Sequence, residues 1–400
     1  MQNIVIVGGG FAGLWAGLAA AKQIDDYAGD IQVTMISTDG YLSIRPRLYE
    51  PNPEALRVPL ANTLDPVGID LIEATVSRID SAARSLSFVT ASGEIESRTY
   101  DQLILTAGSV QKPLPLPGAA ERTWNIDSFE AAVALDEHLH QLTQSPESPG
   151  CRAIVIVGGG FTGIELATEM RSRLAAHSNE ETAKRIRIVL IEQSDVIGPD
   201  LGLNPRPEIE RALQSLDIEL HTSTRVAEVR GHEVVLSNGD TVETKTTIVT
   251  AGLRANPLAN ELQVELDDLG RLPVDEQLHV RDTKNIFAAG DIARAQADES
   301  NVALMSCQHA MPMGRFAGYN AARELLQLPL QAYHQPIYVT CLDLGAAGAM
   351  FTQGWDRSIV LLGADAKDKK RQINTERIYP PTGDKDTILA TAGIDARPPP

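Results

Sequence analysis

Residues 4–13 read IVIVGGGFAG, and residues 154–163 read IVIVGGGFTG. Each copy joins a short, β-branched apolar run to a glycine cluster and then to a helical stretch, LWAGLAAAKQI or IELATEMRSRLAA. A second apolar run follows each helix, at 31–37 and at 186–192. This order is typical of the βαβ unit, whose parallel strands are buried on both faces. The repeat therefore predicts an α/β fold with two Rossmann-like dinucleotide-binding domains.

Three glycines in each copy follow the GxGxxG spacing, namely Gly8, Gly10 and Gly13 in the first and Gly158, Gly160 and Gly163 in the second. The first glycine permits a tight turn, the second lets the backbone approach a pyrophosphate, and the third lets the helix pack on the strand. The helix N-terminus adds N–H donors and a favourable dipole. Because the glycine spacing occurs in two matching copies, a role of these glycines in a turn alone is disfavoured.

The residue that ends the second strand of each unit is expected to bind a ribose. In the second copy it is Glu192, whose carboxylate accepts hydrogen bonds from ribose hydroxyls and repels the 2′-phosphate of NADPH, which favours NADH. In the first copy Ser37 stands there, followed by Thr38 and Asp39. The Ser37 hydroxyl can bond one ribose oxygen. Asp39 either replaces the missing carboxylate or only starts the turn at Gly40, and both interpretations stay open.

The features around each glycine loop also recur in order. Strands are expected at 71–79, 85–90 and 100–109 after the first loop, and at 225–230, 233–236 and 246–253 after the second. Ala91-Ser92-Gly93 and Asn238-Gly239 have the composition of turns. The proline-rich stretch 112–118 is unsuited to a helix or a central strand and is expected to cross between the domains.

Five motifs in this order resemble the flavoproteins of the pyridine nucleotide–disulfide oxidoreductase superfamily, and type II NADH dehydrogenases most of all. They are GGGFAG, LTAG at 105–108, GGGFTGIELATE at 158–169, TAGL at 250–253 and NIFAAGDIA at 285–293. The resemblance covers residues 1–330 and implies FAD and NADH as cofactors, with hydride passing from NADH to the flavin and electrons passing on to an acceptor. It implies an FAD domain at 1–117 and 265–330 with an inserted NAD domain at 118–264. Residues 331–400, with candidate strands at 337–342 and 357–363, are expected to form a small C-terminal α+β domain.

The resemblance also assigns cofactor-binding residues. In the family the aspartate of the last motif, here Asp291, holds a ribityl hydroxyl of FAD, and Gly290 lets the backbone approach a phosphate. RPRLYE at 45–50 resembles a segment in which a proline, here Pro46, lies near the flavin. The other matching positions are Phe11, Ala12, Arg45, Ala107, Gly108, Thr162, Ala251 and Gly252.

Two segments depart from the family pattern. GYLSIRPRLYE at 40–50 holds no cysteine where disulfide reductases carry their redox pair, which excludes a dithiol relay at this position. In type II NADH dehydrogenases a helix rich in alanine and glutamine faces the flavin and the quinone. Gln308, His309 and Ala310 fit that pattern, but Met311-Pro312-Met313 does not keep the glutamine pair. A quinone is therefore the expected acceptor, in an altered pocket.

Four side chains are candidates for chemistry. Glu165, on the first turn after the second loop, either organises the nicotinamide and assists proton movement, or is only a carboxylate favoured by a helix N-terminus. Gln308 is expected at the flavin. His309 is either a proton donor to the reduced acceptor or a packed histidine. Cys307 either forms an adduct or a pair with Cys341, or is a free buried thiol.

Composition limits the partners. The net charge is −18, without a basic stripe, which argues against nucleic acid. Three cysteines without ligand spacing predict neither a metal site nor a disulfide framework, and indicate the cytoplasm. No apolar run approaches the ~20 residues of a membrane span, so membrane contact is expected to be peripheral at most, at the inner face of the cell membrane. The basic cluster at 367–371 is either a solvated face or a contact for an anionic membrane or an acidic redox partner.

Other functions stay open at the level of sequence. One is a soluble reductase that passes electrons to a small redox protein, or a tailoring oxidoreductase in a biosynthetic pathway. Another is a non-enzymatic flavoprotein that responds to NADH. The expected partner is a small-molecule electron acceptor, and a homodimer is one of the open oligomeric states.

Overall fold

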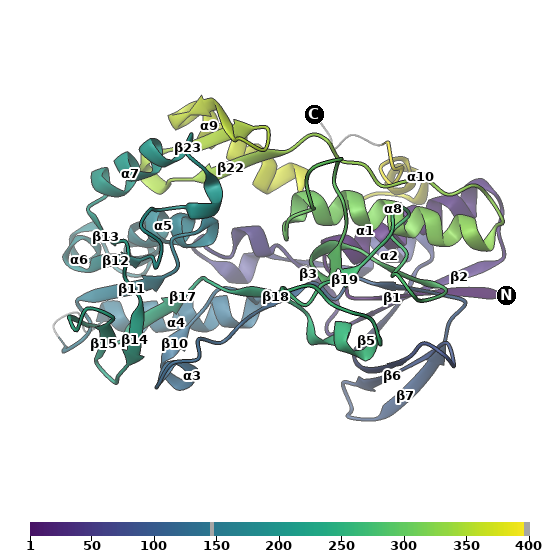
Figure 1. Ribbon diagram of the computed structural model, residues 1–400, viewed down its shortest axis with the longest axis horizontal. Helices are drawn as coiled ribbons and strands as arrows, with labels where there is room; N and C mark the ends of the chain where they lie inside the picture. Colours follow the sequence, from purple (N-terminus) through teal and green to yellow (C-terminus); the bar gives the residue numbers. More distant parts are fainter. Residues whose placement is uncertain (145–147, 396–400) are drawn as a thin grey trace.

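The computed structural model describes residues 1–144 and 148–395, which form two lobes with a C-terminal segment packed across both (Figure 1). Residues 396–400, the end of the predicted C-terminal domain, lie outside the described part. Within the described ranges, no helix is both long enough and apolar enough to cross a membrane.

The first lobe is built on a seven-stranded sheet. Its strands lie in the order β20 (Ile286–Ala288), β8 (Gln102–Leu105), β1 (Gln2–Val7), β2 (Ile31–Ser37), β5 (Asp70–Asp80), β6 (Ser85–Thr90) and β7 (Ile95–Thr99). The first five are parallel to one another, and β5, β6 and β7 form an antiparallel extension. The predicted strands at 71–79 and 85–90 correspond to β5 and β6, which pair with each other, whereas β7 has no counterpart among the predicted strands.

Two helices that are far apart in sequence cover this sheet side by side. These are α1 (Phe11–Asp26), which opens at the first glycine loop, and α8 (Cys307–Leu325) (Figure 1). A Cβ atom at Gly314 would lie 2.2 Å from the carbonyl oxygen of Ala12, and one at Gly318 would lie 1.9 Å from that of Ala16. Only glycine fits at either place, so the two backbones are in direct contact over one helical turn.

The second lobe has a five-stranded parallel sheet. Its order is β10 (Thr123–Trp124), β17 (Thr246–Val249), β11 (Ala153–Val157), β12 (Arg187–Ile191) and β13 (Ile218–His221). The helix after the second glycine loop is α5 (Phe161–His177), and α4 (Phe129–Gln144) packs beside it. A small antiparallel sheet of β14 (Val226–Val229), β15 (Glu233–Leu236) and β16 (Thr241–Glu243) completes the lobe, with the predicted Asn238-Gly239 turn between its last two strands.

The chain crosses between the lobes twice. The outward crossing is β9 (Ser109–Gln111) and the return crossing is β18 (Leu253–Ala255), and the two pair as antiparallel strands. After the return crossing the chain adds β20 to the first sheet, next to β8. The second sheet is therefore formed by a segment of the chain inserted between two strands of the first sheet, β8 and β20. The crossings lie between the lobes in Figure 1.

The C-terminal segment runs over both lobes. It forms the antiparallel strands β22 (Val339–Asp343), β23 (Ala349–Gln353) and β24 (Ser358–Leu362), then α9 (Gly363–Gln372) and α10 (Lys385–Ala390). The predicted strands at 337–342 and 357–363 correspond to β22 and β24, and β23 between them has no predicted counterpart. Lys385 of α10 pairs with Asp25 of α1 at 2.5 Å, so α10 lies on the first lobe.

The remaining elements are short: β3 (Tyr41–Ser43), β4 (Arg57–Pro59), α2 (Ala61–Leu64), α3 (Ala119–Arg122), α6 (Glu180–Arg185), α7 (Arg206–Ser215), β19 (Leu272–Pro273) and β21 (Ala293–Arg294). The architecture agrees with the α/β fold class, two Rossmann-like sheets and a small α+β C-terminal part that the sequence predicts.

Candidate functional site

The two glycine loops have nearly the same backbone. Gly8 and Gly158 adopt φ angles of +112° and +114°, which L side chains rarely take. A Cβ atom at Gly13 would lie 1.8 Å from the Gly8 carbonyl oxygen, and one at Gly163 would lie 1.8 Å from that of Gly158. Each third glycine is thus required by the close approach of helix to strand.

The middle glycines of the loops face open space. A Cβ atom at Gly10 or at Gly160 would meet no atom within 4 Å. Each of these residues caps a helix N-terminus, where unpaired N–H groups and the helix dipole favour a phosphate. The two cradles therefore fit the pyrophosphates of two dinucleotides.

A threonine braces each loop from the neighbouring strand. The hydroxyl of Thr106 donates to the carbonyls of Val7 and Gly8 at 2.8 and 3.0 Å. Thr250 makes the same bonds in the second lobe, to Val157 at 3.2 Å and to Gly158 at 3.0 Å. Sequence reasoning missed both threonines, although their signal was present as the repeated TAG.

The expected ribose ligands lie beneath the loops. Glu192 directly follows β12 and is buried, with its carboxylate accepting N–H bonds from Gly159 and Ser194, both at 2.7 Å. At the matching place in the first lobe Ser37 is buried beneath Gly9, where an added Cβ atom would lie 2.6 Å from the Ser37 hydroxyl oxygen. Thr38 is exposed.

Asp39 is held in its own turn. Its carboxylate accepts a hydrogen bond from the Tyr41 amide at 2.9 Å and pairs with Arg57 at 2.5 Å. These contacts favour the interpretation of Asp39 as a turn residue over that of a substitute ribose ligand.

A polar network gathers around Asp291. The Ser109 hydroxyl donates to its carboxylate at 2.6 Å, and burial raises the pKa of this carboxyl despite that bond. Arg45 pairs with Asp127 at 2.5 Å, and its guanidinium also lies 3.4 Å from the Ser109 hydroxyl. Pro46 follows Arg45 in a short 3-10 turn. The network thus joins segments of the chain that are far apart in sequence.

The other expected cofactor residues lie on the loops themselves. Phe11 and Ala12 are buried in the first turn of α1, and a Cβ atom at Gly290 would come within 2.8 Å of the Ala12 Cβ. Thr162, in the first turn of α5, is exposed. The remaining four follow the two bracing threonines, and they are Ala107, Gly108, Ala251 and Gly252.

Glu165 lies at a junction between the second lobe and the C-terminal segment. Its carboxylate accepts a hydrogen bond from Lys370 of α9 at 2.8 Å and one from the backbone N–H of Asp343 at 2.9 Å. The Glu165 and Lys370 side chains are 5% and 8% exposed. Burial raises the pKa of Glu165 to about 7 against the lowering effect of Lys370. Burial lowers the pKa of Lys370, but the charge and hydrogen bond of Glu165 together with the nearby Cys341 and Asp343 outweigh it, so the net direction is upward.

Further polar groups surround this pair. Asp343 accepts a hydrogen bond from the Tyr49 hydroxyl at 3.0 Å and pairs with Lys367 at 2.5 Å. Burial also raises the pKa of Glu169, to about 7, and the ammonium group of Lys367 lies 3.9 Å away. One interpretation of the basic cluster 367–371 is a solvated face. It is wrong for Lys370, whose ammonium group is buried in an ion pair with Glu165.

The start of α8 carries Cys307, Gln308 and His309. Gln308 accepts the N–H of Val339 at its side-chain oxygen, at 3.2 Å, and its amide nitrogen is buried without a hydrogen-bond partner in the described part of the chain. Such an unpartnered donor is free to bond an acceptor oxygen of a bound molecule. Burial raises the pKa of the free Cys307 thiol to about 11, which disfavours the reactive thiolate.

His309 is packed among aromatic rings. Its ring centroid lies 5.6 Å from that of Tyr338 and 5.9 Å from that of Trp355, and the latter two rings stack at 4.4 Å. Burial lowers the pKa of His309 to about 4, so the ring is neutral near pH 7, with the Ser306 hydroxyl 3.0 Å from Nδ1. These contacts favour a packed histidine over a charged proton donor.

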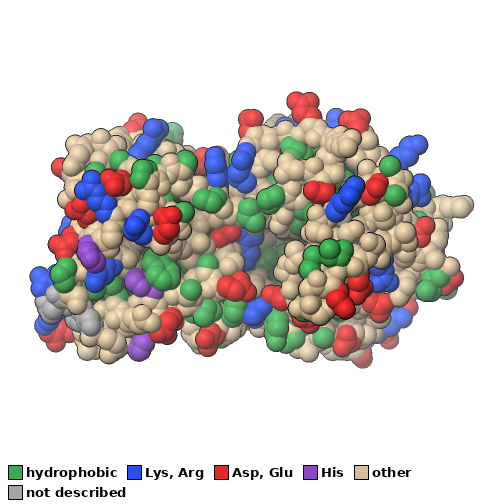
Figure 2. Space-filling model, turned by 90° about the horizontal axis from the view of Figure 1, so that it is seen from below, with side chains coloured by type: hydrophobic (Ala, Val, Ile, Leu, Met, Phe, Trp, Pro, Cys, Tyr) green, Lys and Arg blue, Asp and Glu red, His purple; other side chains and the backbone are tan. Residues whose placement is uncertain are grey.

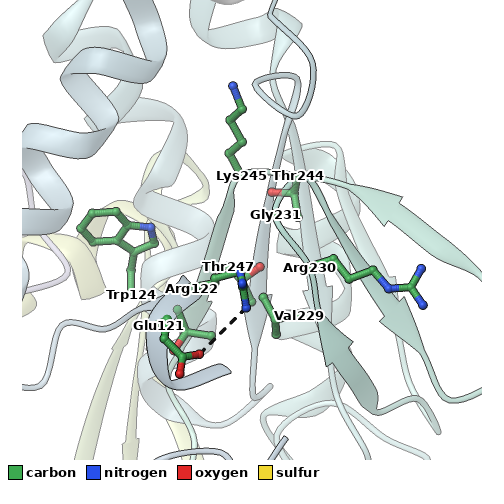
Figure 3. Close-up of a pocket in the computed structure, with 10 residues that line it drawn as sticks. Glu121, Arg122, Trp124, Val229, Arg230, Gly231, Thr244, Lys245 and Thr247 are labelled. Carbon is green, nitrogen blue, oxygen red and sulfur yellow. Dashed lines mark ion pairs between the residues drawn. The ribbon is translucent and has the colours of Figure 1, made fainter. Parts of the chain in front are cut away.

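One hollow lies between the lobes and another lies in the second lobe. A cleft separates the lobes in the view of Figure 2. A cavity of about 330 Å³ in the second lobe is lined by Trp124, Arg230 and Lys245 among others, but these side chains point in different directions (Figure 3). Lys245 precedes β17, so this cavity lies at the amino ends of the parallel strands, opposite the glycine loops.

Comparison with known proteins agrees with this geometry. The model of the family described as pyridine nucleotide-disulphide oxidoreductase matches residues 2–314. The chain belongs to this family. An NADH dehydrogenase-like protein of Mycobacterium tuberculosis is 42% identical over 405 residues, covering 100% of both chains. Demethylphylloquinone reductase of Synechocystis is 28% identical, over 88% of this chain and 86% of that one. NDH2 from Plasmodium falciparum, solved in complex with NADH, has the same fold, with a TM-score of 0.79 at 14% identity over 93% of this chain and 94% of that one.

This oxidoreductase is accordingly NADH dehydrogenase-like, and its cofactors are FAD and NADH. The open cradles at Gly10 and Gly160 fit such cofactors. The expected resemblance, fold class and enzyme class are confirmed.

Proposed function

We propose that the enzyme passes two electrons from NADH through FAD to a quinone or a quinone-like small molecule. We also propose that residues 1–117 and 265–330 form the FAD domain, 118–264 the NAD domain and 331–400 the C-terminal domain. The name of the Synechocystis relative, a demethylphylloquinone reductase, supports such an acceptor. When bound, FAD supplies the centre that takes hydride from NADH and returns electrons to the acceptor.

The two loops would divide the cofactors between them. The first loop, with Ser37 and Asp291, would hold FAD, with Arg45 and Pro46 nearby. The second loop, with Glu192, would hold NADH in preference to NADPH. Its carboxylate already accepts two backbone N–H groups, and a 2′-phosphate would bring negative charge against it.

The observation that carries the acceptor assignment is the unpartnered side-chain amide nitrogen of Gln308, next to the packed ring of His309. Its buried N–H donor has no partner in the described residues, and the next residue, His309, packs against the stacked rings of Tyr338 and Trp355. A molecule that carries a carbonyl oxygen suits this donor, because the oxygen can accept the free hydrogen bond.

Glu165 and Lys370 would manage protons for the second half-reaction. A quinone takes up two protons with its two electrons, and the buried pair holds one proton poised near neutrality. Because the Glu165 pKa is about 7, its carboxyl is protonated below that value and loses the proton above it. Acceptor reduction should therefore slow as the pH rises through about 7, and Glu165→Gln should abolish this dependence.

Anaerobic stopped-flow absorbance tests the proposal. The yellow protein is mixed first with NADH and then with a short-chain quinone analogue. Fast bleaching followed by fast recovery is the expected result. Bleaching without recovery would overturn the quinone assignment and favour a small redox protein as acceptor, and failure to bleach with NADH would overturn the mechanism altogether.

Location and assembly follow as lesser proposals. We expect a cytoplasmic protein with at most peripheral contact at the inner face of the membrane, which a high-salt wash of membranes should release. Light scattering on the purified protein distinguishes a monomer from a homodimer.

A further inference from the structure

Helix α8 contains a break in its hydrogen bonding close to the proposed acceptor site. Pro312 lies inside the helix, two turns or less from its start at Cys307. Proline has no N–H, so the carbonyl of Gln308, four residues earlier, lacks its usual helical donor. A carbonyl in this position must find a donor elsewhere or remain unsatisfied.

Gln335 supplies the missing donor from outside the helix. Its side-chain nitrogen donates to the Gln308 carbonyl at 3.1 Å. Its side-chain oxygen accepts the Tyr333 hydroxyl at 2.8 Å, and its backbone N–H donates to the Ala297 carbonyl at 2.7 Å. With all three groups engaged, Gln335 is held in a single orientation.

The same segment also orients the Gln308 side chain. The backbone N–H of Val339, four residues after Gln335, donates to the side-chain oxygen of Gln308. This bond fixes which end of the amide is oxygen, so the nitrogen is the end that remains buried and unpartnered in the described residues. Residues 335–339 thus hold both the main chain and the side chain of Gln308.

We propose that Gln335 is a positioning residue for the electron acceptor. It donates a hydrogen bond to the Gln308 carbonyl, which Pro312 leaves without a helical donor. In this way it holds the amide N–H of Gln308 in position for a carbonyl oxygen of the acceptor. The inference rests on the proposed function, because it takes Gln308 to face the acceptor. It explains how a helix that Pro312 interrupts still presents a fixed donor.

Four variants and one control separate the steps, and one of the four, Gln308→Ala, removes the proposed donor itself. Gln335→Ala removes the donor to the Gln308 carbonyl. Gln335→Glu keeps an oxygen for the Tyr333 hydroxyl but places a carboxylate against that carbonyl. Gln335→Ala combined with Pro312→Ala restores a helical N–H for it. His334→Ala, at the exposed neighbouring residue, is the matched control.

The readouts are the two half-reactions, measured by anaerobic stopped flow with NADH and with a short-chain quinone analogue. We expect Gln335→Ala to raise the KM for the quinone about tenfold, as for the loss of one fixed hydrogen bond, with bleaching by NADH within about twofold of the wild type. Gln335→Glu should be worse, and the double variant should recover most of the loss. FAD content and the unfolding midpoint identify any variant that is merely misfolded.

Other results would overturn the inference. Unchanged quinone kinetics in Gln335→Ala, together with impaired quinone kinetics in Gln308→Ala, would overturn it. Gln308 would then act without support from Gln335. If the quinone kinetics do not recover in the double variant, Gln335 does not act through the unpaired carbonyl of Gln308. A changed flavin spectrum or slower bleaching, with normal quinone kinetics, would assign the Gln308 donor to the flavin. If Gln308→Ala itself reacts normally with the quinone, the proposed acceptor site fails, and the inference fails with it.

Discussion

Replacing Lys370 by methionine tests the buried pair that fastens the C-terminal segment to the second lobe. Methionine keeps an unbranched chain of similar length but removes the charge and the donors. Lys370 gives hydrogen bonds to the Glu165 carboxylate at 2.8 Å and to the Cys341 carbonyl at 3.0 Å. Both side chains of the pair are almost fully buried, so water cannot replace what is lost.

The size of the effect depends on pH. Removing one partner of a buried pair costs roughly 3–5 kcal/mol if the other stays charged. The pKa of Glu165 is already about 7, and the loss of Lys370 raises it further because Lys370 lowers it. At pH 6 the carboxyl is therefore protonated in the variant, and the cost reduces to the lost hydrogen bonds, roughly 1–3 kcal/mol.

Above pH 7 the two proteins diverge. A carboxyl whose pKa is raised by folding contributes stability at low pH that is lost as the pH rises to the folded value. The wild type is already about half ionised at pH 7, whereas the variant is still protonated. Between pH 7 and 8 Lys370→Met should therefore lose roughly 1 kcal/mol more than the wild type does.

The assay is urea unfolding of the FAD-loaded enzyme at pH 6, 7 and 8, followed by far-UV circular dichroism. The double variant Glu165→Gln with Lys370→Met carries no charge at this pair, so its difference from the wild type should not grow between pH 7 and 8. An unchanged midpoint for Lys370→Met at pH 8, or the same loss at pH 6 and pH 8, would refute the reasoning.

The remaining predictions concern the cradle, the helix contact and the thiol. Glu192→Ala should raise the KM for NADH about tenfold, since two ribose hydroxyls lose their acceptor, and an unchanged KM in steady-state assays would contradict the assignment. Gly314→Ala should destabilise the protein by roughly 1–3 kcal/mol, because its Cβ would meet the Ala12 carbonyl at 2.2 Å, and a lower melting temperature is the check. Cys307, with a thiol pKa of about 11, should react with iodoacetamide at pH 7.5 far more slowly than a free cysteine does, as measured by mass spectrometry of the modified peptide.

The glycine loops could be predicted from sequence because their physics is local. Strand, turn and helix follow one another within ten residues, and the glycines at 8 and 158 adopt the positive φ angles that their motif requires. Glu192 was found in the same way, since the end of the second strand is a fixed place in a βαβ unit. The repeated order of motifs then gave the fold class.

The acceptor side could not be predicted in this way, because its contacts join distant segments. Glu165 and Lys370 are 205 positions apart, and Lys370 stood in a run of charges that looked solvated. Only the packing of α9 on β22 and β23, and of β22 on α5, removes it from water. Gln335 gave no signal either, because a single glutamine in a linker acquires a role only once Pro312 has opened a carbonyl opposite it.

The place of β20 in the first sheet has a consequence for how the chain is made. On the ribosome, strand β8 emerges long before β20, and the whole second lobe is synthesised in between. Until then β8 is an open edge with unpaired backbone groups, and such an edge invites pairing with another chain. The second lobe has all its strands earlier and can mature first. We expect the nascent first lobe to depend on chaperones longer than the second, although its first strand leaves the exit tunnel before any other.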